Sequence, residues 1–301
     1  MSQSLAHGQP DAGSPPEPAA ITAGFAASAT QLACLLEASA EKPGNVTPSR
    51  AFGDMSYEDF LRSAVAIGPV MGRAGELSVG DTILAAVEAS RTWTRANTNV
   101  GIILLFAPLA KAAFVSQVDL RANLQEVLAG LTVHDARQAY RAIRLAAPGG
   151  LEDRVEHDIH DEPDVTLLEA MRSASARDKI AAEYCSNFAT IFELALPNLL
   201  AILATKPSSR QMVVQLYLEV LAAVPDTLIA RKREMVTARE VSRQARQVLQ
   251  AGGVYSERGR QAMTRFDISL RQAADNSLNP GTTADLVAAT LFAALLMGKF
   301  K

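Results

Sequence analysis

The sequence predicts an all-α protein, a single-domain bundle of about ten helices with a central buried helix. Apolar residues recur at spacings of three and four along nearly the whole chain, while alternating β-branched runs are absent. Of the 301 residues, 49% are hydrophobic and 20% are charged, a balance that suits one large core. No linker rich in Pro, Gly and Ser divides residues 25–301. We therefore expect one helical domain over residues 23–301.

The periodic segments define the expected helices, and two helix starts have capping-box spacing. Ser78-Val79-Gly80-Asp81 and Thr132-Val133-His134-Asp135 carry Asp where Glu is usual. The apolar run from Val100 to Val115 contains Pro108 and Lys111, so it predicts a buried core helix instead of a membrane span. The expected helices cover residues 24–40, 56–72, 79–95, 100–116, 119–130, 133–147, 166–203 with a break, 209–223, 234–251, 257–274 and 282–298.

Charge and composition limit the partners and the compartment. The first 20 residues are rich in Pro, Gly and Ser and lack the pattern of a signal peptide, so we expect a disordered tail over residues 1–22. A formal net charge of -3 gives no overall attraction to nucleic acid or to an anionic membrane. Cys34 and Cys185 lie in apolar helical patterns without metal or redox spacing, which predicts reduced, buried thiols in a cytoplasmic protein.

The acidic segment from Glu152 to Asp164 is a marked charge cluster. Two interpretations stay open, a solvated loop and a metal site, and the loop is favoured because the spacing matches no specific metal motif. The potential ligands are Glu156, His157, Asp158, His160 and Asp161.

Polar residues at helix ends are the best candidates for a site, because loops on a helical scaffold commonly carry function. The last helix begins in Asn279-Pro280-Gly281-Thr282-Thr283-Ala284-Asp285, where free N–H groups and hydroxyls suit phosphate binding. Thr282 or Thr283 can equally be an ordinary helix cap. The segment Lys42-Pro43-Gly44-Asn45 supplies an ammonium and an amide, but it is also a plain turn.

Other polar side chains allow two interpretations each. Asp54 precedes a helix, where it can bind Mg²⁺ through water or cap the helix. Asn97 and Asn99, just before Gly101, can cap the apolar helix or face a ligand. Glu88 and Glu183 lie among small apolar residues, where an unpaired buried charge is costly. No Ser/His/Asp arrangement, GxGxxG or Walker sequence is present, so a nucleotide would need helix ends, Mg²⁺ and scattered polar residues.

Taken in order, these segments resemble the triphosphoribosyl-dephospho-CoA synthase family over residues 30–298. The family element P-K-P-G-L/N-V corresponds to Glu41 to Val46, D-M to Asp54-Met55, and G-x-N-T-H-K-G to Ala96 to Gly101. The element R-G-E-A-x-x-G-F corresponds to the region ending Glu183 to Phe188, D-T to Asp226-Thr227, and N/S-P-G-G-S-A-D-L to Asn279 to Leu286. No single element is specific to the family, but the occurrence of all of them in the same order over nearly the whole chain is specific.

The resemblance implies an all-α enzyme that uses ATP as a substrate, releases adenine and attaches the triphosphate-bearing ribose to the 2′-hydroxyl of dephospho-CoA. Such a step requires stabilisation of an oxocarbenium ion, an anion clamp and a base for the hydroxyl. We expect four catalytic carboxylates in one cleft: Asp54, Glu183, Asp226 and Asp285. Candidate Mg²⁺ ligands are Asp54, Glu88 and Asp285. The expected ligand-binding residues are Lys42, Gly44, Asn45, Asn97, Asn99, Gly101, Asn279, Gly281, Thr282 and Thr283.

One element departs from the family pattern. Where the family has N-T-H-K-G, this chain has Asn97-Thr98-Asn99-Val100-Gly101, so an imidazole and an ammonium are missing. The altered element, with Arg177-Asp178, Glu183-Tyr184 and Gly281-Thr282-Thr283, resembles a divergent branch linked to tetrahydromethanopterin-dependent one-carbon metabolism.

Three functions therefore stay open: the CoA-type synthase, an ATP- or phosphate-ligand-using step in tetrahydromethanopterin or methanofuran-type cofactor biosynthesis, and a non-catalytic helical scaffold. In the first two, the partner is a small nucleotide, CoA-like or cofactor-precursor molecule. The enzyme functions predict that the carboxylates and asparagines converge in one pocket, whereas a scaffold predicts that the carboxylates scatter over the surface. The oligomeric state is not determined by the sequence.

Overall fold

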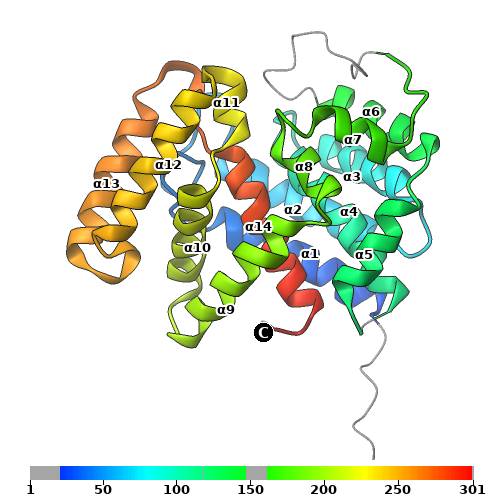
Figure 1. Cartoon of the computed structure of the whole chain (residues 1–301), viewed down its shortest axis with the longest axis horizontal. Coiled ribbons are helices and arrows are strands. Elements are labelled where there is room, and N and C mark those ends of the chain that lie inside the picture. Colours follow the sequence, from blue (N-terminus) through cyan, green and yellow to red (C-terminus); the bar gives the residue numbers. More distant parts are fainter. Residues whose placement is uncertain (1–20, 117, 147–160, 300–301) are drawn as a thin grey trace, which may run out of the picture.

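The computed structural model describes residues 21–116, 118–146 and 161–299 (Figure 1). These residues form 14 α-helices, with one π-helical segment and two short 3-10 turns, and they contain no sheet. The all-α prediction is confirmed. The expected count of about ten helices is too low, because the segment 166–203 is divided more often than expected and because a short helix near residue 230 was not predicted.

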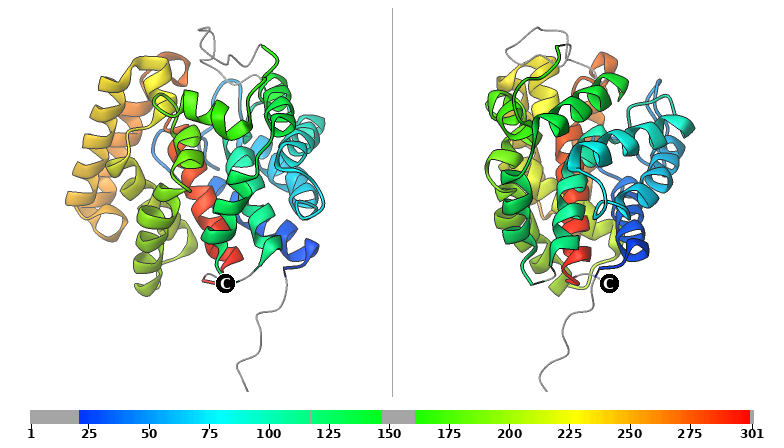
Figure 2. Two further views of the ribbon diagram at one scale, coloured as in Figure 1. Left: turned by 45° about the vertical axis from the view of Figure 1, so that its right-hand side comes forward. Right: turned by 90° about the vertical axis from the view of Figure 1, so that its right-hand side faces the viewer.

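The helices form two groups on either side of the last helix. The first group holds α1 (Ala23–Ala38), α2 (Tyr57–Met71), α3 (Val79–Trp93), α4 (Val100–Val115), α5 (Leu120–Ala129), α6 (Val133–Ala146), α7 (Leu167–Ala174) and α8 (Lys179–Cys185). The second holds η1 (Thr190–Ala195), α9 (Leu196–Ala204), α10 (Ser209–Ala223), α11 (Thr227–Arg233), α12 (Met235–Gln250), η2 (Gly253–Tyr255), α13 (Glu257–Arg271) and η3 (Ala274–Asn276). Figures 1 and 2 show α14 (Gly281–Leu296) between the groups.

The apolar helices α4 and α14 pack side by side and run in the same direction. At their starts Gly101 lies against Asp285, and further along Phe106 stacks on Phe292 with ring centroids 4.3 Å apart. Both rings are fully buried. Burial of one such side chain stabilises the fold by about 1.5–3 kcal/mol. Because the two helices are parallel neighbours, their polar N-terminal ends meet on one side of the molecule.

The two predicted capping-box starts are confirmed. The Ser78 hydroxyl accepts a hydrogen bond from the Asp81 N–H at 3.1 Å, and α3 begins at the next residue, Val79. The Thr132 N–H donates to the Asp135 carboxylate at 2.8 Å, directly before α6. In both cases the shorter Asp replaces Glu without loss of the helix start.

The predicted long segment 166–203 is broken twice. Asp178 caps α8 by accepting from the Ile180 and Ala181 N–H groups at 2.8 and 3.1 Å, which separates α8 from α7. Asn187 and Phe188 then adopt positive φ of 50° and 56°, a conformation that cannot continue a right-handed helix. The chain resumes as π-helix and then as α9.

Several expectations fall outside the described residues or need correction. Most of the tail, and residues 152–160 with His157 and His160, lie outside the described ranges. Cys34 is buried as expected, but Cys185 is exposed because it ends the short helix α8 on its outer face. Among the helices that the structure describes, no single one is long and apolar enough to cross a membrane; three helix pairs reach that length and composition only across bends of more than 40°.

Candidate functional site

Asp226 joins the start of α11 to the start of α14. Its Oδ1 accepts from the N–H groups of Leu228 and Ile229 at 2.9 and 3.1 Å, which caps α11. Its Oδ2 accepts from the N–H and the hydroxyl of Thr283 at 2.7 and 2.8 Å. The residue is only 1% exposed, and this burial raises the pKa of its carboxyl although the four donors act to lower it. Asp226 is therefore held rigidly, with its lone pairs occupied by the protein.

Asp285 lies one turn into α14 and faces the first turn of α4. A Cβ added at Gly101 would approach Asp285 Oδ2 to 2.1 Å, so only glycine leaves room for this carboxylate. Asp285 keeps partial exposure to solvent. Burial, followed by the nearby carboxylates of Glu37 and Asp226, raises its pKa well above the usual range of Asp. A partly accessible carboxyl with a raised pKa is typical of acid–base sites.

The threonine hydroxyls connect three helix starts around these two carboxylates. Thr282 Oγ1 lies 3.2 Å from Thr227 Oγ1 and accepts from the Leu228 N–H at 3.2 Å. Thr227 Oγ1 also accepts from the Lys179 N–H at 3.1 Å. The starts of α8, α11 and α14 are thereby fastened together. Thr283 acts as a partner of Asp226, so both threonines have structural bonds in addition to any ligand contact.

Glu183 extends this cluster along α8. It is fully buried, and its Oε1 lies 2.9 Å from Lys179 Nζ, one turn earlier in the helix. Its Oε2 accepts from the Ile191 N–H at 3.3 Å. The predicted cost of a buried Glu183 charge is thus offset by an ion pair with a side chain from its own helix.

Lys42 forms a buried ion pair with Glu37, a residue that the sequence analysis did not single out. Lys42 Nζ lies 2.9 Å from Glu37 Oε1, and the two residues are 1% and 2% exposed. The ammonium also donates to the backbone carbonyls of Glu37 and Ala40 at the end of α1. A cation at a helix C-terminus complements the helix dipole. Lys42 was expected to bind a ligand, but in this structure its ammonium is directed to α1. The sequence signal that could have indicated this pair is that Lys42 follows Glu37 by five residues, just after the end of the apolar helix α1.

The turn after Lys42 packs on α13 and on the start of α14. Gly44 has φ +74°, and its N–H donates to Asp267 Oδ1 at 2.8 Å. A Cβ there would lie 2.5 Å from Leu270 Cδ1. The carbonyl of Asn45, itself buried, accepts from Arg271 Nη2 at 2.5 Å. Asp267 and Arg271 are therefore part of the surroundings of the site, although no motif marked them.

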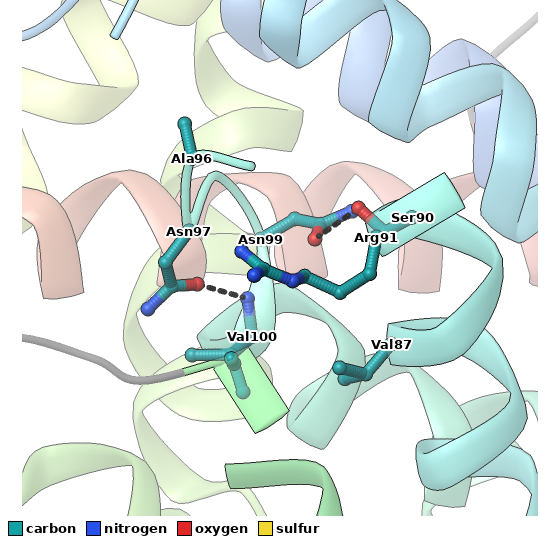
Figure 3. A pocket seen from close by; sticks show the side chains of 8 residues that line it. Val87, Ser90, Arg91, Ala96, Asn97, Asn99 and Val100 are labelled. Atoms are coloured by element: carbon teal, nitrogen blue, oxygen red, sulfur yellow. Dashed lines mark hydrogen bonds between the residues drawn. The ribbon is translucent and has the colours of Figure 1, made fainter. Parts of the chain in front are cut away.

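Three residues of the Asn97–Gly101 segment, Asn97, Asn99 and Val100, line a small pocket between α3 and α4 (Figure 3). Asn97 Oδ1 accepts from the Val100 N–H at 3.4 Å. Asn99 is 7% exposed, and its Oδ1 accepts from the Ser90 hydroxyl at 3.3 Å. Within the described part of the chain, Asn99 Nδ2 has no hydrogen-bond partner. This amide therefore combines a fixed orientation with an unused donor.

The loop before α14 completes the arrangement. Asn279 Oδ1 is buried and has no hydrogen-bond partner in the described structure. A Cβ at Gly281 would lie 2.6 Å from Leu228 Cδ2, so a side chain there would displace the end of Leu228. The start of α14 thus contributes an unused amide oxygen beside the hydroxyls of Thr282 and Thr283.

Asp54 and Glu88 lie apart from this buried cluster. Asp54 is exposed, in a loop whose Phe52 ring lies 5.8 Å from the Arg271 guanidinium. It does not cap α2, because Asp59 forms the capping box with Ser56. Glu88 is exposed on α3. In the three described ranges, no group of three His, Cys, Asp or Glu side chains could hold a metal ion.

Comparisons with known proteins agree with the sequence resemblance. Residues 23–301 match the family model described as CitG, ATP:dephospho-CoA triphosphoribosyl transferase. The "Probable 2-(5''-triphosphoribosyl)-3'-dephosphocoenzyme-A synthase" of Vibrio cholerae is 27% identical over 277 residues, which cover 86% of this chain and 84% of that protein. The "2-(5''-triphosphoribosyl)-3'-dephosphocoenzyme-A synthase" of Klebsiella pneumoniae is 33% identical over 105 residues, 35% of this chain and 36% of that protein.

A solved structure shares the fold. The crystal structure of a "putative triphosphoribosyl-dephospho-coA synthase" from Archaeoglobus fulgidus superposes with a TM-score of 0.60 at 26% identity, covering 79% of this chain and 99% of that one. The family model spans nearly the whole chain, including every helix start that forms the site. The chain is an enzyme and belongs to the ATP:dephospho-CoA triphosphoribosyl transferase family.

Proposed function

We propose that this enzyme transfers the triphosphoribosyl group of ATP to the 2′-hydroxyl of 3′-dephospho-CoA and releases adenine. The match of the family model supports this reaction. The observation that carries the proposal for the site is the contact of Asp285 with Gly101, which brings the first turns of two apolar helices together around one carboxylate. A scaffold has no need of a partly exposed carboxylate held among other buried acids.

In the proposed step, the bond between ribose C1 and adenine N9 breaks and a bond forms between C1 and the acceptor oxygen. The proton of the acceptor hydroxyl passes to a base, and adenine takes up a proton as it leaves. We assign the base to Asp285, because a carboxyl with a raised pKa accepts a proton more readily near neutral pH than an ordinary Asp. Its negative form also stabilises positive charge on the ribose in the transition state.

We assign a positioning role to Asp226 and Glu183. All four hydrogen bonds of Asp226 go to the protein, so its contribution is to hold Thr283 and the α14 start where Asp285 needs them. Glu183 is paired with Lys179 and holds α8 beside Thr227. Lys42 keeps a structural role through its ion pair with Glu37. The proposed surroundings of the ligand are Gly44, Asn45, Asn97, Asn99, Gly101, Asn279, Gly281, Thr282 and Thr283.

Mg²⁺ is part of the proposal as the companion of ATP. Mg²⁺ is commonly held by one or two carboxylates together with substrate phosphates, so it does not require a cage of protein ligands. Asp285, a residue of intermediate exposure, suits this arrangement in its ionised form as an alternative to its role as the base. Asp54 and Glu88 keep their proposed ligand roles only if the bound substrate reaches their exposed positions. The ion would neutralise phosphate charge.

We also propose a cytoplasmic location, where free thiols stay reduced.

The direct test is adenine release by the purified full chain in MgATP and dephospho-CoA, followed by chromatography. We expect adenine and a triphosphoribosylated product in equal amounts, with no adenine when dephospho-CoA is omitted. The Asp285→Asn variant should lose the reaction while it stays folded. Absence of adenine release by the wild type would refute the proposed reaction.

A second function rests on the replacement of the family's His-Lys by Asn99-Val100, which changes the charge beside the ligand. We propose as the alternative an ATP- or phosphate-ligand-using step in tetrahydromethanopterin or methanofuran-type cofactor biosynthesis. Parallel incubations with a pterin or a furan intermediate test it. Turnover of one of these without turnover of dephospho-CoA would select the alternative.

A further inference from the structure

The pocket between the end of α3 and the start of α4 has the side chains of an anion site. Its lining is apolar except for Ser90, Arg91, Asn97 and Asn99. Arg91 is the charged residue among the described residues that line it, and the enclosed space is about 10 Å³, room for one water, within a hollow of about 200 Å³ that is open to solvent. In Figure 3 the Arg91 side chain extends from α3 toward Asn97 and Val100.

The buried amide of Asn99 provides an independent sign of a ligand. Asn99 is 7% exposed, and Ser90 fixes its Oδ1, which leaves Nδ2 as an unpaired donor in the pocket lining. A buried donor without a partner destabilises the folded protein. An acceptor atom bound in the pocket would remove this cost. The Ser90 hydroxyl also lies 3.0 Å from Ser63 Oγ, so its single hydrogen is shared between Ser63 and Asn99.

The helix that begins at this pocket adds to the positive potential. α4 has 16 residues and no acidic residue in its first turn. The N-terminus of a helix of this length carries partial positive charge and attracts anions. Its cap, Asn99, makes no side-chain capping bond, so the amide remains available to a ligand.

We infer that Arg91 and Asn99 bind a phosphate group of the substrate at the solvent-open side of this pocket, with Ser90 as the residue that positions Asn99. This inference rests on the proposed function, which it deepens by locating a phosphate. Gly101, one residue after Val100 of the pocket, lies against Asp285, so the phosphate and the proposed base flank the same turn of α4. The positive charge at this pocket comes from Arg91 on α3, because the residue that α4 contributes, Val100, is uncharged.

Binding of inorganic tripolyphosphate tests the site independently of turnover. Arg91→Gln should weaken binding about 10- to 100-fold in isothermal titration, as expected for loss of a hydrogen-bonded charge. Arg91→Lys should restore part of it. Arg210→Gln, a change of an exposed arginine at the start of α10, should bind as the wild type does. Asn99→Asp replaces the donor by a negative acceptor, so it should also weaken binding although Arg91 is unchanged in this variant. Melting curves establish that each variant is folded.

Kinetics then identify the source of the phosphate. If the triphosphate of ATP is bound, Arg91→Gln raises KM for ATP about tenfold or more and leaves KM for dephospho-CoA unchanged; the reverse result assigns the diphosphate of dephospho-CoA. Unchanged tripolyphosphate binding in folded Arg91→Gln and Asn99→Asp would overturn the inference, as would a wild type that binds no tripolyphosphate. A wild type that binds it through Arg91 but releases no adenine would instead refute the proposed reaction and leave the site standing.

Discussion

Asp226 and Thr283, 57 positions apart in the chain, are joined by two hydrogen bonds to one carboxylate oxygen. The second oxygen of Asp226 caps α11. One buried side chain thus fixes the relative position of α11 and α14. The orientation of Asp285, two residues after Thr283, depends on this link.

Replacing Asp226 by Asn should destabilise the protein by about 2–4 kcal/mol. The amide keeps one acceptor oxygen but turns an N–H donor toward other donors, so at least one helix cap is lost and a buried N–H is left unpaired. Urea unfolding of Asp226→Asn and of the wild type measures the difference. A variant as stable as the wild type would show that the links to Thr283 and to α11 contribute little.

Asp285→Asn should have the opposite effect on stability while it abolishes activity. The pKa of Asp285 is raised in the folded state, so the folded protein binds its proton more tightly than the unfolded chain does. The ionised group therefore costs stability progressively as pH rises from about 4, its unfolded pKa, toward its folded pKa. Asn removes that cost. Unfolding curves from pH 4 to pH 8 should show an advantage of the variant that grows with pH; a constant difference would contradict the raised pKa.

Lys42→Met should destabilise the protein by about 3–5 kcal/mol, because Glu37 would be left buried without its cation. The double variant with Glu37→Leu should recover most of that loss, since both charges are then removed together. Urea unfolding of the two single variants, the double variant and the wild type forms a double-mutant cycle. If the Lys42 ammonium binds phosphate instead, tripolyphosphate binding should fall in the double variant even where stability is restored.

Gly101→Ala should lower kcat strongly, because its Cβ would displace Asp285 Oδ2 from a distance of 2.1 Å. Overpacking of this kind also costs about 1–3 kcal/mol of stability. Gly101→Ala combined with Asp285→Ala should regain stability but not turnover. Gly24→Ala is the matched control, since a Cβ at Gly24 meets nothing within 4 Å.

The two thiols should react at very different rates. Cys34 is buried, and burial followed by the nearby Glu37 and Asp285 raises its pKa well above the usual range of a thiol. Cys185 is exposed, and burial of part of its thiol raises its pKa to a smaller extent. Titration of the native protein with a thiol reagent should modify Cys185 alone, with Cys34 reacting after unfolding in urea. Rapid reaction of both thiols in the native protein would contradict the burial of Cys34.

Local sequence signals located most helices closely. α10 spans Ser209–Ala223, as expected, Ser78 caps α3 through its hydroxyl, and the capping box at Thr132 is formed in the structure. These features involve residues within four positions of each other, so periodicity and side-chain chemistry suffice to predict them. α11 was not predicted, because its seven residues are too few for a periodic pattern and because its formation depends on capping by Asp226.

The motifs also indicated the family, but they did not reveal how the site residues are paired. Sequence order placed Asp226 in a different segment from Thr283 and Asp285, which share one helix start, and it did not mark Glu37, Asp267 or Arg91. Asp54 was grouped with the buried carboxylates, whereas the structure places it in an exposed loop. A motif identifies residue types at local spacing and has no information on which way a side chain faces.

The sequence by itself determined most of the helices, the starts of two of them, the all-α class and the family resemblance, because each depends on residues close together in the chain or on their order. Only the tertiary structure decided that Lys42 pairs with Glu37, that Asp226 holds Thr283 and that Asp285 faces Gly101. Asp285 meets Gly101 because α4 and α14 run side by side, with Phe106 stacked on Phe292. The direction and depth of that packing follow from how all the buried side chains fit together, which no local pattern specifies.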